Sequence, residues 1–146
     1  MKLYILCLTT ILTFIFSLNT FARDEVGDYS IVNAMSSEKA NSALGSDIRF
    51  YFGTKNPGTI EKKYGTYSAN KKTNAFNKTD EGACNWAFLS AMKSLKNRAM
   101  REGGNAVINI KSNYRDNETT SNKTFKCGAG NVVAGVALKG TVVKLK

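Results

Sequence analysis

Apolar residues in the middle of the chain recur with the period of a helix, and the rest of the chain is expected to pack around this segment. Between Thr79 and Gly103 they form a single stripe at i, i+3, i+4 and i+7 spacing: Cys84, Ala87, Phe88, Ala91, Met92, Leu95 and Ala99. Thr79 is a suitable N-cap, and acidic residues at 80 and 81 favour the positive end of the helix dipole. Glycines at 103 and 104 predict the end of the helix.

Strand patterns precede this helix. Residues 47–52 alternate between apolar and polar side chains, as a half-buried strand does, and a Pro-Gly turn follows them. A more polar strand is expected over residues 59–68, followed by a basic, Asn-rich loop over residues 70–78. Further upstream, we expect a short strand over residues 29–33 and a brief helix that Gly45 ends.

More strands follow the helix. Residues 105–112 are β-branched and apolar, as expected of a central strand, and residues 132–145 are almost continuously apolar. A polar loop is expected over residues 114–123, and residues 124–127 begin the return toward the last strand. The predicted fold class is α+β, an antiparallel β-sheet with one long amphipathic helix packed on it.

An uncharged apolar run lies near the start of the chain. Residues 3–18 follow a single lysine, which is the pattern of a secretory signal peptide, and cleavage is expected after Ala22. The expected organisation is a signal peptide over 1–22, an N-terminal polar segment over 23–46 and the α+β domain over 47–146. An uncleaved N-terminal anchor is the alternative. Export leads to the periplasm or to the outside of the cell, and the sequence leaves both destinations open.

Cleavage of the signal peptide removes Cys7 and leaves two cysteines, Cys84 and Cys127. In an oxidising compartment, an even pair of cysteines predicts a disulfide. In the chain-entropy model, a crosslink that closes a loop of this length stabilises the fold by roughly 4 kcal/mol. Two free thiols are the alternative.

The composition argues against an enzyme. The chain has no histidine, which removes the commonest general base and the commonest metal ligand. The carboxylates fall mainly in short groups at 24–25, 80–81 and 116–118, without a fixed partner for acid–base chemistry. No glycine-rich phosphate-binding loop and no Cys-x-x-Cys pair occurs. We therefore expect no catalytic residue, no metal site and no cofactor.

The net charge of +10 carries the functional expectation. Basic residues cluster in the strand and loop before the helix and on its outer face: Lys62, Lys63, Lys71, Lys72, Lys78, Lys93, Lys96, Arg98 and Arg101. Tyr64, Tyr67 and Phe76 interleave with the first group. Such clusters bind phosphates of lipid headgroups, lipopolysaccharide or nucleic acid. Lipid phosphate ranks above nucleic acid because an exported protein meets far more of it. A surface that only maintains solubility is the alternative.

The second half of the chain resembles a group of small bacterial domains. Over residues 84–144, the order of helix, GGNAV, strand, hairpin and GVALKGTVVK is similar to YbjQ-like and RcsF-like domains. The likeness to the RcsF-like family is most specific after Cys127, in the series Gly135, Ala137, Leu138 and Thr141. It implies that Cys84 and Cys127 are joined. Relatives often carry an excinuclease or ATPase-subunit label, which the missing phosphate-binding loop does not support.

These observations predict an exported, non-enzymatic binding protein whose basic surface engages anionic ligands. The ligands expected are phospholipid or phosphoinositide headgroups, or envelope lipids. The resemblance implies an alternative, an envelope module that binds a protein partner through a sheet edge or loops. A self-assembling ring, as some YbjQ-like domains form, and a secreted effector of unknown target are further alternatives.

Overall fold

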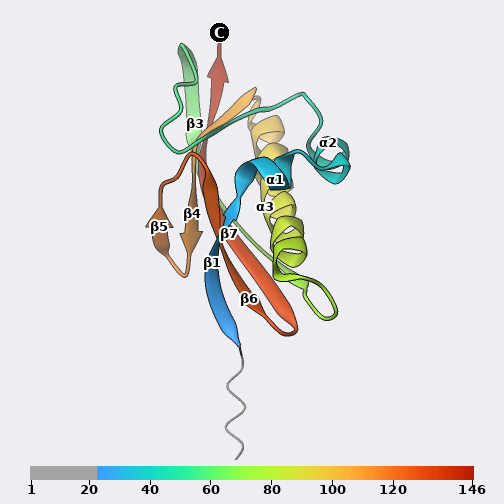
Figure 1. Ribbon diagram of the computed structural model, residues 1–146. Helices are drawn as coiled ribbons and strands as arrows, with labels where there is room; N and C mark the ends of the chain where they lie inside the picture. Colours follow the sequence, from blue (N-terminus) through green and yellow to red (C-terminus); the bar gives the residue numbers. More distant parts are fainter. Residues whose placement is uncertain (1–22) are drawn as a thin grey trace, which may run out of the picture.

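The computed structural model describes residues 23–146, so the predicted signal peptide over 1–22 lies outside the described residues. Within this described range, three helices and seven strands follow one another (Figure 1). Their order is β1 (Asp24–Ser30), α1 (Ile31–Met35), α2 (Glu38–Leu44), β2 (Arg49–Phe52), β3 (Ile60–Asn74), α3 (Asp80–Glu102), β4 (Ala106–Tyr114), β5 (Asn117–Thr119), β6 (Thr124–Gly130) and β7 (Val133–Leu145). The α+β class is confirmed.

All strands belong to one sheet, and β7 is its organising strand. On one side β7 pairs along its whole length with β3. On the other side its first half pairs with β6 and its second half with β4, so these two strands fork from the same edge. β1 extends the sheet beyond β6, while β2 and β5 pair with β4.

The expectation of an antiparallel sheet is wrong at one pair, because β2 and β4 run parallel. Adjacent antiparallel strands can be joined by a hairpin, whereas parallel neighbours need a long crossover. The chain between β2 and β4 contains β3 and the whole of α3, which supplies that crossover. The sheet is therefore mixed.

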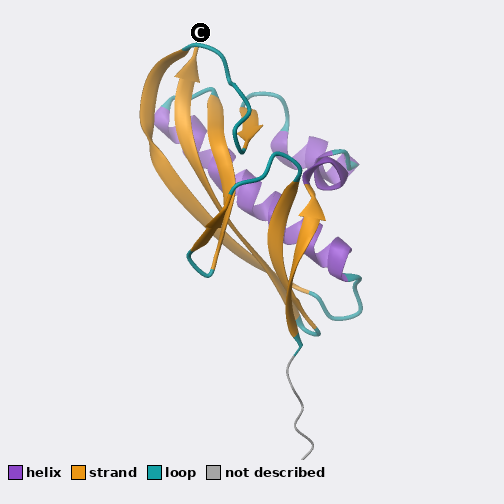
Figure 2. Ribbon diagram, turned by 60° about the vertical axis from the view of Figure 1, so that its left-hand side comes forward, coloured by secondary structure: helices purple, strands orange, loops and turns teal. Residues whose placement is uncertain are grey.

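The long helix α3 packs along one face of the sheet, as Figure 2 shows. Its apolar stripe is buried as predicted, and Phe88 stacks on Phe125 of β6 with the ring centroids 4.2 Å apart. The expected fold class with one long helix on the sheet is incomplete, because the short helices α1 and α2 pack against α3. The opposite face of the sheet, here called the open face, carries a smaller apolar cluster around Ile108 and Val143.

The ends of α3 are those that the sequence predicted. The Thr79 side-chain oxygen accepts a hydrogen bond from the Gly82 amide at 3.1 Å. At the other end Gly103 has φ +79°, and its amide donates to the carbonyls of Ala99 and Met100. A left-handed residue is the usual helix end, and glycine adopts it without strain.

The N-terminal segment differs from expectation in its strand. β1 ends at Ser30, because the Ser30 hydroxyl accepts from the Asn33 amide at 3.2 Å and begins α1 there. Every residue of β1 pairs with β6, so this segment is part of the same sheet. The brief helix ended by Gly45 is confirmed as α2.

Two expected loops contain strand. β3 continues to Asn74 because β7 offers it a pairing partner as far as Val133. β5 forms within the expected loop after β4. Among the described residues, no helix is long and apolar enough to cross a bilayer.

Candidate functional site

A disulfide joins Cys84 in the first turns of α3 to Cys127 in β6, with the two Cα atoms 5.8 Å apart. Both residues are fully buried. The crosslink that the sequence predicted is confirmed, and it holds the start of α3 on the sheet.

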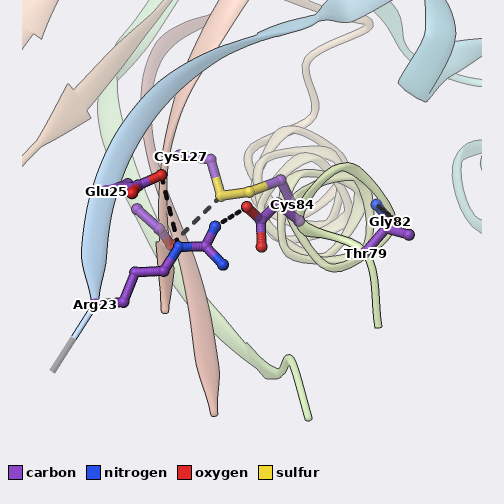
Figure 3. Close-up of polar contacts among 8 residues, drawn as sticks. Arg23, Glu25, Thr79, Gly82, Cys84 and Cys127 are labelled. Carbon is purple, nitrogen blue, oxygen red and sulfur yellow. Dashed lines mark hydrogen bonds and ion pairs between the residues drawn. A yellow bond between two sulfur atoms is a disulfide. The ribbon is translucent and has the colours of Figure 1, made fainter. Parts of the chain in front are cut away.

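Arg23 forms a second link beside the disulfide (Figure 3). Its guanidinium donates to the carboxylate of Asp80 and lies 3.5 Å from that of Glu25. The hydrogen bond to Asp80, followed by the Coulomb attraction of the same group, raises the pKa of Arg23. Asp80 therefore connects the start of α3 to the start of β1. Within residues 23–146, no three His, Cys, Asp or Glu side chains come together as a possible metal site.

The four predicted lysines of β3 divide between the two faces of the sheet. Residues directly opposite in an antiparallel pair share a face. Lys71 is opposite Val136, which belongs to the core under α3, and Lys72 is opposite Gly135, which lines the open face. Lys63, opposite Val143, also lies on the open face. The lysines predicted as one cluster therefore lie on both faces of the sheet.

The predicted basic residues of β3, α3 and the loop between them are of two kinds. Two of them have acidic partners: Lys96 lies 3.8 Å from Asp47, and Arg98 lies 3.2 Å from Glu102. Across the described range 23–146, the remaining predicted residues make no ion pair: Lys62, Lys63, Lys71, Lys72, Lys78, Lys93 and Arg101. All of these are exposed.

Tyrosines join β3 to α3 along this basic edge. The Lys62 ammonium lies 4.8 Å from the ring centre of Tyr64, and the Arg98 guanidinium lies 4.5 Å from that of Tyr67. Burial, and then a hydrogen bond to Glu102, raise the pKa of the Tyr67 hydroxyl. In the described part of the chain β3 pairs with β7 alone, so it is an edge strand. Lysines on such a strand also prevent it from pairing with another chain.

A groove lies on the open face, at the fork where β4 and β6 separate. Its volume is about 580 Å³. We call it the open-face groove, and its lining residues are Arg23, Asn70, Lys72, Tyr114, Arg115, Gly128, Gly130, Asn131, Val132, Val133, Gly135 and Ala137. Among these described residues three are basic and none is acidic.

The fork itself is fixed by two contacts. The buried Ser112 hydroxyl accepts a hydrogen bond from the Lys126 amide at 2.8 Å, which ties β4 to β6 where they separate. Beyond this point, Tyr114 lies over Gly128. A Cβ atom added at Gly128 would be 1.8 Å from the Tyr114 hydroxyl oxygen. Only glycine lets the tyrosine ring lie against β6.

Lysines next to the groove are neutralised by a single carboxylate. Glu118 of β5 binds Lys111 of β4 and, at 2.7 Å, Lys139 of β7. The hydrogen bonds from Lys111 and Lys139 lower the pKa of Glu118 to about 2. Glu118 therefore stays ionised at all physiological pH values and fixes the β4–β5 hairpin beside the groove.

A second, smaller hollow of about 390 Å³ lies between α2 and α3. The exposed Trp86 ring forms one wall, with the Lys39 ammonium 4.9 Å from its centre. The side-chain oxygen of Asn85, which also lines this hollow, is buried and has no hydrogen-bond partner among the described residues.

The sequence prediction included one residue of the open-face groove, Lys72, and missed the others. The aromatic and basic pair at 114–115 lay in an expected loop, and Gly135 lay in a segment that was expected only to form a strand. A signal was present, because glycine inside a strand often marks a close approach of backbone or ligand. No protein-family model matches the chain, and a search of curated proteins finds no match.

Proposed function

We propose that this is an exported, non-enzymatic binding protein whose basic surface engages anionic lipid headgroups, either of phospholipids or of envelope lipids. The unpaired cations carry the proposal. The carboxylates of Asp28, Asp80 and Glu118 form ion pairs with other cations of the domain. The lysines of β3 and the exposed cations of α3 are left available for an external anion.

Export is supported by two independent features. The leader pattern of the sequence is that of a secretory signal peptide. The disulfide belongs to an oxidising compartment, since cytosolic reductants keep thiols reduced. An exported protein of high positive charge meets anionic lipid at membrane surfaces.

The cations are spread out, and this arrangement suits binding to an extended anionic surface better than binding of one small ion in an enclosed site. The lysines of β3 alternate between the two faces of a 15-residue edge strand, and Lys93 and Arg101 lie on the exposed side of α3. Near an anionic membrane each lysine or arginine contributes about 1 kcal/mol, and this attraction disappears beyond a Debye length.

Sedimentation with vesicles tests the proposal. The mature protein is mixed with vesicles of phosphatidylcholine, with or without phosphatidylglycerol, at about 0.01 M and about 1 M ionic strength, where the Debye length is about 30 Å and about 3 Å. We expect cosedimentation with the anionic vesicles at the lower ionic strength only. Indifference to phosphatidylglycerol under that condition would remove the proposal.

Salt also separates lipid binding from the protein-interaction alternative. Crosslinked pull-down from the periplasm is repeated after a high-salt wash. A specific protein partner should survive salt that releases lipid, because packed apolar contacts are not screened. A salt-resistant partner together with no vesicle binding would favour the alternative.

A further inference from the structure

Three glycines line the open-face groove. Contacts within the protein explain why two of these positions require glycine. Gly128 accommodates Tyr114, as described above, and a Cβ atom at Gly130 would be 2.7 Å from the backbone oxygen of Arg23. Gly135 is different. The atoms nearest to its added Cβ are Lys72 Cγ at 3.5 Å and the Lys71 carbonyl oxygen at 3.8 Å, both ordinary contacts.

The backbone gives no reason for glycine at this position either. Gly135 is an interior residue of β7, paired with Gly128 on one side and Lys72 on the other, and it does not have a left-handed φ. Glycine inside a strand is unfavourable, and it often marks a bulge, a tight bend or a close approach of a ligand or of another backbone. The β3–β7 pair has no register shift at Gly135, and this favours the close approach of a ligand. A side chain at residue 135 would fill the middle of the groove floor.

We propose that the open-face groove binds a hydroxylated ring that carries a phosphate group, with the ring lying over Gly135. This groove would be one particular site of the anion binding proposed above, and the inference rests on that proposed function. The floor at Gly135 and Ala137 carries no large side chain, and the Tyr114 ring lies beside it over Gly128. Exposed valines at 132 and 133 form an apolar end wall. These surfaces suit the face of a ring.

The polar groups suit the substituents of such a ring. Asn70 of β3, Asn131 of the β6–β7 turn and the Tyr114 hydroxyl offer donors and acceptors for ring hydroxyls around the floor. Lys72 brings a positive charge from the β3 wall, and it makes no ion pair among residues 23–146. A charge-assisted hydrogen bond to phosphate is the strongest contact that it can make there.

The structure supplies a variant that should block the site without harming the fold. Gly135→Val places its Cβ atom at ordinary contact distances, and valine is favoured in strands. We expect Gly135→Val to unfold no more easily than the wild type and to lose ligand binding. A variant that merely disrupted the protein would lose stability and binding together.

A second pair of variants separates the groove from general electrostatics. Lys72→Gln and Lys71→Gln remove the same charge from adjacent residues of one strand, but on opposite faces of the sheet. Binding in the groove predicts a loss of affinity of about tenfold for Lys72→Gln, which corresponds to one charge-assisted contact. For soluble inositol monophosphate, Lys71→Gln should change the affinity by less than about twofold, because its side chain is on the other face and only distant screening remains. The comparison is made with this soluble ligand, since on anionic vesicles both lysines contribute to the general attraction.

Amide NMR titration of the mature protein is the experiment. The probes are inositol monophosphate, inositol alone, inorganic phosphate alone, and vesicles that contain phosphatidylinositol monophosphate. We expect saturable shifts at the amides of Gly128, Gly135 and Ala137 with inositol monophosphate, weaker binding of either half alone, and none in Gly135→Val. Comparison of the free ring with the vesicles shows whether the source is a soluble metabolite or a lipid headgroup.

Three results would overturn the site. They are equal shifts with inorganic phosphate alone, unchanged binding by Gly135→Val, and equal losses in Lys71→Gln and Lys72→Gln. Vesicle binding that Gly135→Val leaves intact would refute the groove but not the proposed lipid binding. Failure of every probe, including anionic vesicles at low ionic strength, would refute both.

Discussion

Replacement of both cysteines by alanine tests what holds α3 on the sheet. The two residues are 43 positions apart, and a loop of that size corresponds to about 4 kcal/mol in the chain-entropy model. Both side chains are fully buried, so the loss of two sulfur atoms adds to the destabilisation. The expected loss is a large part of the roughly 5–15 kcal/mol by which domains are stable.

Urea unfolding of the mature protein, followed by circular dichroism, measures this loss. With a slope of about 2 kcal/mol per molar urea, a loss of about 4 kcal/mol lowers the midpoint by about 2 M. Reduced wild-type protein is the matched control, because it loses the crosslink and keeps the sulfur atoms. If the double variant and the reduced protein both unfold within about 1 kcal/mol of the oxidised protein, the crosslink is not what secures the helix.

Two further predictions concern the region around the groove. Gly128→Ala should destabilise the fold by about 1–3 kcal/mol, because its Cβ displaces Tyr114. In a double-mutant cycle, Tyr114→Ala should remove most of that cost, and additive losses would contradict the contact. Lys111 and Lys139 hold the pKa of Glu118 at about 2, below its ordinary value of 4.5. The stabilising effect of Glu118 is therefore complete above about pH 4.5 and is lost as the pH falls to about 2. A carboxyl NMR titration should show this midpoint, and Lys139→Gln should raise it; an ordinary midpoint in the wild type would refute the assignment.

The long helix could be predicted closely because its signals are local. The cap at Thr79, the stripe of buried residues and the glycine end at Gly103 depend on neighbours in the sequence. The disulfide between Cys84 and Cys127 followed from compartment and number rather than from geometry.

The extent of β3 could not be predicted from its own residues. Its second half is polar and rich in lysine and asparagine, and its strand conformation comes from pairing with β7, far along the chain. The parallel pair of β2 and β4 likewise depends on a crossover that no local pattern reveals. Tertiary pairing decided both.

The groove could not be predicted for a similar reason. Arg23, Lys72 and Arg115 come from three distant segments, and they line one hollow only because β4 and β6 separate beside β7. The sequence predicted a basic surface from the abundance of lysine. It contained no indication of which cations share a face.

Vesicle binding by a charge variant of β3 tests the central claim most directly. The variant replaces four exposed lysines with glutamine: Lys62, Lys63, Lys71 and Lys72. Light scattering first confirms that the variant is as monodisperse as the wild type, since these lysines also protect an edge strand. At about 0.01 M ionic strength the wild type should bind phosphatidylglycerol vesicles, and the variant should lose about 1 kcal/mol of binding free energy for each lysine removed. Equal binding of the two proteins to anionic vesicles, or equal binding of the wild type to neutral ones, would contradict the account.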